Sequence, residues 1–149
     1  MKSRQTKLRI LLDTSFILPS LGINTGKEAL KGLRMLAKTE TEIHYSRFSI
    51  LESLWVAARM TGGILDEAFN TGLRSILEGG RYKEVKEDSK VFSEALRLYI
   101  QGHRDMIDNI LYTASVNLDL KLLTVDKELK EFIRKNGLED TLITPDQLA

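Results

Sequence analysis

The chain has 149 residues, which fits one domain with a core that buries roughly 70% of the surface of the unfolded chain. Its 22 Lys and Arg residues against 21 Asp and Glu residues give a formal net charge of +1, which excludes a global electrostatic footprint for nucleic acid or an anionic membrane. The absence of cysteine excludes disulfides, zinc–thiolate sites and thiol nucleophiles, and agrees with an intracellular, cytoplasmic protein.

Short apolar runs typical of β-strands alternate with segments of 3.6-residue periodicity, the pattern of an α/β domain with a mostly parallel sheet. The first apolar run follows a basic segment, is interrupted by Arg9 and ends at Asp13, so we expect a strand there, and no signal peptide or membrane span. In chain order we predict a strand at 8–12, a helix at 27–38, a strand at 42–45, helices at 47–60 and 65–77, a weaker strand at 82–85, helices at 90–101 and 105–118, a strand at 121–125, a helix at 127–135 and a strand at 141–143.

Glycine-containing breakers separate these helices at Gly62-Gly63, Gly79-Gly80, Gly102 and Gly137. The two prolines, Pro19 and Pro145, both fall where an element is expected to end. No internal repeat or linker interrupts the pattern, so residues 1–149 are expected to form a single domain.

Four carboxylates stand beside nearly apolar segments. Asp13 and Asp126 each close an apolar run, and the carboxyl ends of parallel strands meet at one edge of a sheet, where ligands of open α/β sheets bind. Glu52 follows the second strand by about two helical turns, and Asp108 opens the helix that leads to the Asp126 strand. We therefore expect all four side chains to reach one crevice.

Carboxylates that converge on one crevice need a proton or a cation to offset their repulsion. Two like charges about 4 Å apart repel by roughly 4 kcal/mol at an effective dielectric constant near 20, so the group must share protons or bind a cation. A hard divalent ion is the natural choice, because it prefers oxygen ligands. The hydroxyls of Thr14 and Ser15, directly after Asp13, could support such an ion or its water.

Each acid also has a purely structural interpretation. Asp13 could form an Asx-type turn, and Asp126 is well placed to cap the last helix. Asp105 and Asp108 share a helical face; we assign the N-cap to Asp105, which places Asp108 at about the third helical position and leaves Asp105 as a supporting candidate. For Glu52 the choice stays open, because other acids lie in the same half of the chain: Glu28, Glu40, Glu42 and Glu67.

Together these segments resemble the PIN-domain nucleases, including the VapC-type toxins. The resemblance rests on Leu11-Leu12-Asp13-Thr14-Ser15, Ile50-Leu51-Glu52, Asp108-Asn109-Ile110-Leu111 and Leu123-Thr124-Val125-Asp126, and it spans about the whole chain. It implies a Rossmann-like, three-layer fold of about four to five strands and an Mg²⁺- or Mn²⁺-dependent ribonuclease. The acids carried over as catalytic residues and metal ligands are Asp13, Glu52, Asp108 and Asp126, with Thr14, Ser15, Thr124 and Asp105 in support.

The chain departs from the family pattern in two places. Residues 117–120 lack the glycine often found there, and Tyr112-Thr113 replace smaller residues. Both changes affect packing more than the proposed metal ligands. The resemblance further implies an RNA substrate, a homodimer and a possible antitoxin protein, since the chain could be the toxin of a toxin–antitoxin pair. The alternative is a catalytically silent PIN-like binding or assembly module.

Two sets of residues bear on partners. Arg47, Arg104 and Lys127 lie next to proposed site elements and are candidates for binding substrate phosphates, although each could be a solvated surface charge. Apolar residues on the 47–60 and 65–77 helices are expected to belong to the core, with a dimer interface or an antitoxin groove as the alternative; they are Trp55, Ala58, Met60, Phe69, Leu73, Ile76 and Leu77.

Overall fold

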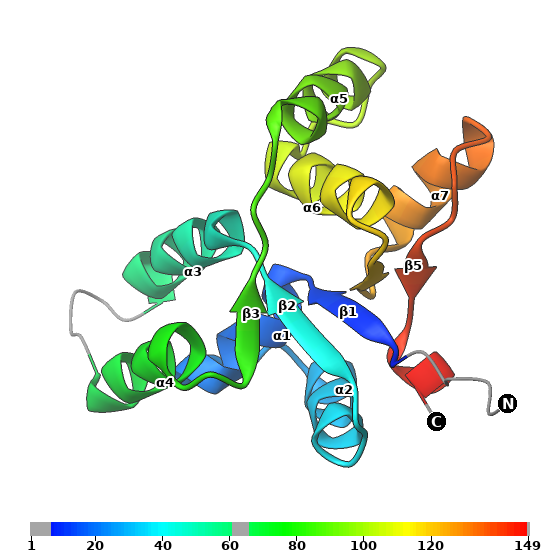
Figure 1. The fold of residues 1–149 in the computed structure, drawn as a ribbon. Coiled ribbons are helices and arrows are strands. Elements are labelled where there is room, and N and C mark those ends of the chain that lie inside the picture. The colour runs from blue at the N-terminus through cyan, green and yellow to red at the C-terminus, as the bar shows by residue number, and fades with distance from the viewer. Residues whose placement is uncertain (1–6, 61–65, 149) are drawn as a thin grey trace, which may run out of the picture.

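The computed structural model describes residues 7–60 and 66–148. Its centre is a five-stranded sheet of order β3-β2-β1-β4-β5 in which all neighbouring strands are parallel (Figure 1). The parallel arrangement confirms the predicted α/β class. The strands are β1 (Arg9–Leu12), β2 (Glu42–Tyr45), β3 (Tyr82–Glu84), β4 (Lys121–Leu123) and β5 (Leu142–Ile143).

The helices agree with the predicted periodic segments to within one or two residues at each end that the structure describes. The start of the 65–77 helix at Leu65 and the Gly62-Gly63 breaker lie outside the described residues. The helices are α1 (Thr14–Ile17), α2 (Lys27–Ala37), α3 (Arg47–Met60), α4 (Glu67–Glu78), α5 (Ser89–Ile100), α6 (Met106–Asn117) and α7 (Lys127–Lys135), with 3-10 helices η1 (Leu18–Leu21) and η2 (Pro145–Leu148).

Alternating side chains of the central strands divide the core into two layers. Ile10 and Leu12 of β1 pack in a cluster with α1, α2, α3 and α4, whereas Leu11 packs in a second cluster with α5, α6 and α7. Figure 1 shows these groups of helices on opposite faces of the sheet. The three layers follow from strands that are apolar on both faces, which is the pattern of parallel sheets covered by helices.

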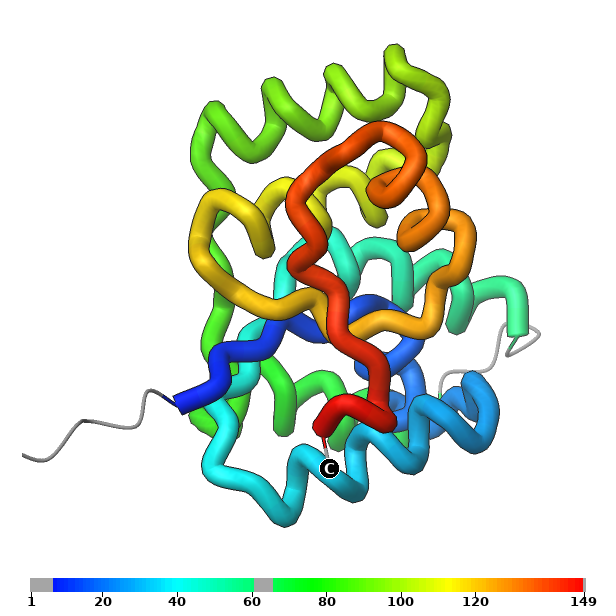
Figure 2. Tube along the Cα trace, turned by 90° about the vertical axis from the view of Figure 1, so that its right-hand side faces the viewer, coloured from blue at the N-terminus to red at the C-terminus, as the bar shows by residue number. Residues whose placement is uncertain are grey.

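The short helices after β1 are the main elements that periodicity did not predict. Asp13 caps α1 by accepting a hydrogen bond from the Thr14 N–H, and η1 continues the chain with Pro19 in its first turn. α4 packs so closely on η1 that a Cβ at Gly72 would lie 2.0 Å from the Ser20 carbonyl oxygen. At the other end of the chain, η2 lies against α2 (Figure 2).

The expectation that the apolar helical residues are core is right for α4 and wrong for α3. Phe69 and Ile76 are 6% and 1% exposed, but Trp55 and Met60 are 54% and 63% exposed and Ala58 is exposed too. The reason is that α3 contacts the core through a narrow stripe that includes Ala57, and its apolar residues run all around the helix. No helix within residues 7–60 and 66–148 has the length and apolar character needed to cross a membrane.

Candidate active site

The carboxyl ends of β1 and β4 lie side by side, and a hydrogen bond joins the residues that follow them. The Thr124 hydroxyl donates to Oδ2 of Asp13 at 2.9 Å, and the Thr14 N–H donates to Oδ1 of Asp13 at 2.7 Å. Thr124 in turn accepts a hydrogen bond from the Asp126 N–H at 3.1 Å. Asp13 is only 7% exposed, so these bonds hold a nearly buried carboxylate in one orientation.

Two further acids are held at helix starts. Asp126 is the N-cap of α7 and accepts hydrogen bonds from the N–H groups of Glu128 and Leu129. Asp105 is the N-cap of α6 and accepts a hydrogen bond from the Asp108 N–H at 3.1 Å, which places Asp108 at the third helical position as predicted. The two capping predictions are therefore confirmed, and a cap fixes the direction of its own side chain.

All four predicted acids line one cavity of about 260 Å³ at this edge of the sheet, together with Asp105, Thr14 and Ser15. Glu52 reaches it from α3, which starts directly after β2 and packs against α1. The other glutamates of this half do not line it. Glu42 is engaged by Lys83 and Arg9 near the amino end of β2, Glu40 precedes that strand, Glu67 lies on α4 and Glu28 lines a neighbouring cavity.

Burial and the negative charges of neighbouring acids raise the pKa values of three of these carboxyls, Asp13, Glu52 and Asp108. Burial raises the pKa of Asp13 to about 6, with the charges of Glu52 and Asp126 adding to the rise against the hydrogen bonds from Thr124 and Thr14. Burial also raises the pKa of Asp108 well above its usual range, and Asp13, Asp126 and Asp105 raise it further. Perturbed acids in a cleft mark a functional-site candidate.

Glu52 is shifted in the same direction. Burial raises its pKa and the charge of Asp105 adds to the rise, while the Thr14 hydroxyl opposes it. That hydroxyl is buried and its geometry falls short of a hydrogen bond with any described residue. The cavity thus contains both repelling carboxylates and an unsatisfied polar atom, each of which costs free energy unless a ligand compensates it.

The donor atoms around this cavity are all carboxylate and hydroxyl oxygens, the ligand chemistry of Mg²⁺ and Mn²⁺. Within residues 7–60 and 66–148, no three His, Cys, Asp or Glu side chains already stand around a common point as metal ligands do. The repelling carboxylates and the unpaired Thr14 hydroxyl are what such an ion would compensate. The residues therefore fit a hard divalent cation by chemistry and charge.

The three residues predicted to bind substrate phosphates lie at different places relative to the acid cavity. Arg47 donates to Glu84 at 2.8 Å and lines none of the cavities around the acids. Arg104 lines the adjoining cavity of about 840 Å³ that also contains Glu52 and Asp108, and its guanidinium lies 5.3 Å from the centre of the Tyr99 ring. Lys127 lines a cavity on the other side of Asp126.

A buried His–Asn pair beside the acids was not foreseen. Asn109 is completely buried; its Nδ2 donates to the His103 carbonyl at 2.7 Å, and its Oδ1 lies 2.6 Å from His103 Nδ1. The pair ties residues 103–105 to the start of α6 and so positions Asp105 and Asp108. The signal in the sequence was an asparagine at the start of the apolar run Ile110-Leu111, since a buried amide must find partners.

Comparison with solved structures supports the fold. A toxin–antitoxin complex from Klebsiella pneumoniae matches with a TM-score of 0.58 and 15% identity, covering 91% of this chain and 97% of that chain. VapC20 of Mycobacterium tuberculosis, a sarcin–ricin-loop-cleaving toxin, matches with a TM-score of 0.64 and 15% identity over 82% of this chain and 93% of its own. VapBC2 of Rickettsia felis matches with a TM-score of 0.60 and 12% identity, covering 92% and 98%.

Sequence comparison adds the family. No curated protein matches the chain. The family model described as PIN domain matches residues 10–135, a span that runs from β1 to the end of α7 and contains every acid of the cavity. This match agrees with the parallel sheet and with the four acids at its carboxyl edge. The chain belongs to the PIN domain family.

Proposed function

We propose that the protein is a divalent-metal-dependent endoribonuclease whose catalytic acids are Asp13, Glu52, Asp108 and Asp126. The observation that carries the proposal is the convergence of these four acids on one cavity at the carboxyl edge of the sheet. The PIN-domain match and the resemblance to a toxin that cleaves the sarcin–ricin loop support a nuclease. Mg²⁺ or Mn²⁺ is the proposed cofactor, because the site offers only hard oxygen donors.

The chain's own residues would act mainly by holding oxygens in place. A bound divalent ion supplies charge neutralisation at the phosphoryl group and a water of lowered pKa. Thr124 fixes Asp13 through its hydrogen bond, the start of α7 fixes Asp126, and Asp105 holds the first turn of α6 that carries Asp108. Thr14 and Ser15 would support the ion or its water from the start of α1.

RNA cleavage tests the proposal directly. The purified protein should cleave a mixed-sequence RNA with Mg²⁺ or Mn²⁺, and EDTA should abolish the cleavage. Asp13→Asn, Asp108→Asn and Asp126→Asn should each lower the rate by at least about a hundredfold, because each removes a charge from the metal site. Glu40→Gln is the matched control, since Glu40 is exposed and lies outside the acid cavity. Unchanged cleavage by the three aspartate variants would refute the assignment.

A silent PIN-like module is the alternative, and metal binding distinguishes the two. Calorimetric titration with Mn²⁺ should show binding to the wild-type protein, with a rise in melting temperature as the ion relieves carboxylate repulsion. Binding that Asp13→Asn and Asp126→Asn weaken, without any cleavage of RNA, would support the module. No binding and no stabilisation at millimolar Mn²⁺ would count against a metal site altogether.

We also propose a homodimer and an antitoxin partner. Two helices carry exposed apolar side chains, among them Trp55 on α3 and Ile100 on α5, which are 54% and 74% exposed. An edge-to-face contact between Phe48 and Phe92, with ring centres 5.5 Å apart, joins the two helices. Apolar surface of this kind marks a protein interface, and the similar structures include a toxin–antitoxin complex from Klebsiella pneumoniae. The toxin role in such a pair is part of this proposal.

A further inference from the structure

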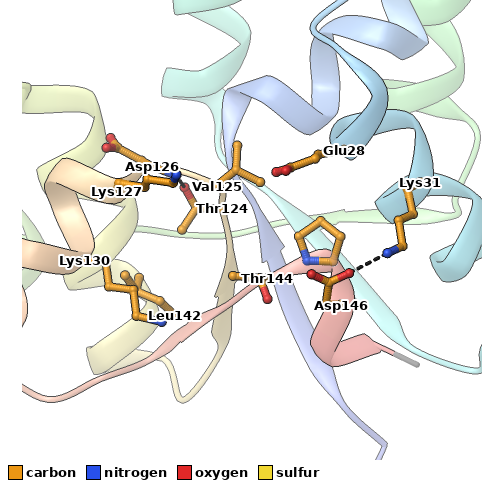
Figure 3. Close-up of a pocket in the computed structure, with 11 residues that line it drawn as sticks. Glu28, Lys31, Thr124, Val125, Asp126, Lys127, Lys130, Leu142, Thr144 and Asp146 are labelled. Carbon is orange, nitrogen blue, oxygen red and sulfur yellow. Dashed lines mark hydrogen bonds and ion pairs between the residues drawn. The ribbon is translucent and has the colours of Figure 1, made fainter.

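A second cavity adjoins the acid cluster on its β5 side. It has a volume of about 450 Å³ and lies between α2, α7 and the segment that follows β5 (Figure 3). Val125, Leu142 and Pro145 are its apolar lining residues, and Val125 and Asp126 also line the cavity of the acid cluster. Charged and polar side chains surround this apolar surface, among them Glu28, Lys127 and Lys130, so polar contacts would fix the orientation of an occupant, and the occupant would sit directly beside the proposed catalytic acids.

Glu28 supplies a free carboxylate to this cavity. It lies in the first turn of α2, and Figure 3 shows its carboxylate directed from α2 toward Val125. Within the described part of the chain it forms no ion pair and accepts no hydrogen bond, because Lys31, one turn further along α2, pairs with Asp146 instead. A glutamate in a first turn is also favourable for the helix dipole, but that effect leaves both carboxylate oxygens available.

The opposite wall carries positive charge. Lys127 and Lys130 are three residues apart on α7, so they lie on one face of that helix, and both line the cavity. Neither forms an ion pair with the residues of 7–60 and 66–148. Since Lys31 and Asp146 neutralise each other, Glu28 on one wall faces two lysines on the other, an arrangement that suits a molecule with hydrogen-bond donors at one end and a phosphate at the other.

We propose that this cavity binds a guanine nucleotide of the RNA substrate, with Glu28 accepting hydrogen bonds from N1–H and N2–H of the base and Lys127 and Lys130 facing its phosphates. The proposal rests on the proposed ribonuclease function. Unpaired bases of RNA are read on their Watson–Crick edges, and two adjacent donors match the two oxygens of a carboxylate. Guanine alone among the four bases has such a pair, because the other three have an acceptor next to each donor.

Binding of short RNAs in the presence of EDTA tests the subsite independently of cleavage. Fluorescently labelled pentauridylate RNAs that carry G, A, C or U at the central position are titrated with the protein, and the anisotropy is followed. The G-containing RNA should bind about tenfold more tightly than the other three, which lies within the discrimination expected from one bidentate contact to a base. Glu28→Gln should remove the difference, because an amide presents a donor where guanine also has one.

The variants separate base reading from general affinity. Glu40→Gln, which changes an exposed glutamate outside this cavity, should keep the preference for G. Lys130→Ala should weaken the binding of all four RNAs to a similar extent, since a phosphate contact carries no sequence information. Equal binding of the four RNAs by the wild-type protein, or a G preference that survives in Glu28→Gln, would overturn the subsite.

Cleavage then distinguishes the two proposals. Sequencing the products of a randomised RNA cut in the presence of Mn²⁺ should show guanosine enriched at one fixed distance from the cut, and Glu28→Gln should cut without this enrichment. Cutting with no base preference would overturn the subsite and leave the nuclease in place. A G preference in binding without any cutting by the wild-type protein would refute the nuclease and leave a guanine-binding cavity.

Discussion

The Thr124 hydroxyl donates a hydrogen bond of 2.9 Å to Oδ2 of Asp13, across 111 positions of sequence. The bond joins the residues that follow β1 and β4, which are neighbours in the sheet, and it is buried. The same hydroxyl accepts from the Asp126 N–H. One threonine therefore sets the relative positions of two of the proposed metal ligands.

Replacing Thr124 by valine should weaken both the fold and the site. Valine has nearly the same shape but leaves Asp13 Oδ2 and the Asp126 N–H without their partner, which should cost about 1–3 kcal/mol of unfolding free energy. Mn²⁺ affinity should fall as well, because Asp13 is no longer held. Chemical denaturation and calorimetry measure the two effects. Thr124→Ser keeps the hydroxyl and should restore metal affinity; a valine variant with wild-type metal affinity would contradict the role of the bond.

The raised pKa of Asp13 makes the metal-free protein less stable as the pH rises. The folded-state pKa is about 6 against an ordinary value of 3.8, so the unfolded chain loses its proton first, and the penalty grows between these two pH values and is complete above pH 6. A shift of roughly two pKa units corresponds to about 3 kcal/mol.

Asp13→Asn should therefore flatten the fall in stability between pH 4 and pH 6, and should be more stable than wild type at pH 7 in EDTA. Urea unfolding at a series of pH values measures this. Glu40→Gln, at an exposed position before β2, should keep the wild-type slope. A wild-type slope in Asp13→Asn would mean that the burial of this carboxyl is not what opposes folding.

The Asn109–His103 pair should be among the most sensitive positions near the site. Asn109→Ala leaves the His103 carbonyl and ring nitrogen buried without partners, which should cost about 3 kcal/mol of unfolding free energy. Mn²⁺ affinity should also fall, because the pair anchors the residues around Asp105. Asn117→Ala on the same helix is the comparison: its amide bonds Glu94 and the Thr113 carbonyl at a more exposed position, and its loss should cost about 1 kcal/mol with metal binding unchanged.

The exposed apolar residues of α3 and α5 should decide the oligomeric state. If they form the dimer interface, Trp55→Glu or Ile100→Glu should convert a dimer to a monomer, since a charge cannot be buried there without a partner. Light scattering coupled to size exclusion measures the mass. Arg74→Glu, on the exposed side of α4, should leave the dimer intact. A wild-type protein that runs as a monomer would contradict the proposed homodimer.

Local signals along the chain were enough to predict the sheet and most of the helices. Apolar runs and glycine breakers predicted the bounds of β1, β2 and α7 to within about one residue. These elements depend on contacts between residues near in sequence and on a core that covers both faces of the sheet. The N-caps at Asp105 and Asp126 were predicted for the same reason: a cap is a hydrogen bond between residues two or three apart. The four-residue helix α1 is too short to carry a period and was missed.

Long-range packing decided the rest. That Glu52 and not Glu28, Glu40, Glu42 or Glu67 lies with the three aspartates depends on how α3 crosses the sheet, which no local pattern encodes. Trp55 and Met60 are as apolar as core residues, yet lie at the surface because α3 offers only one stripe to the core. By itself the sequence determined which carboxylates end the central strands; only the tertiary structure, through burial and the approach of like charges, raised the pKa values of Asp13 and Asp108.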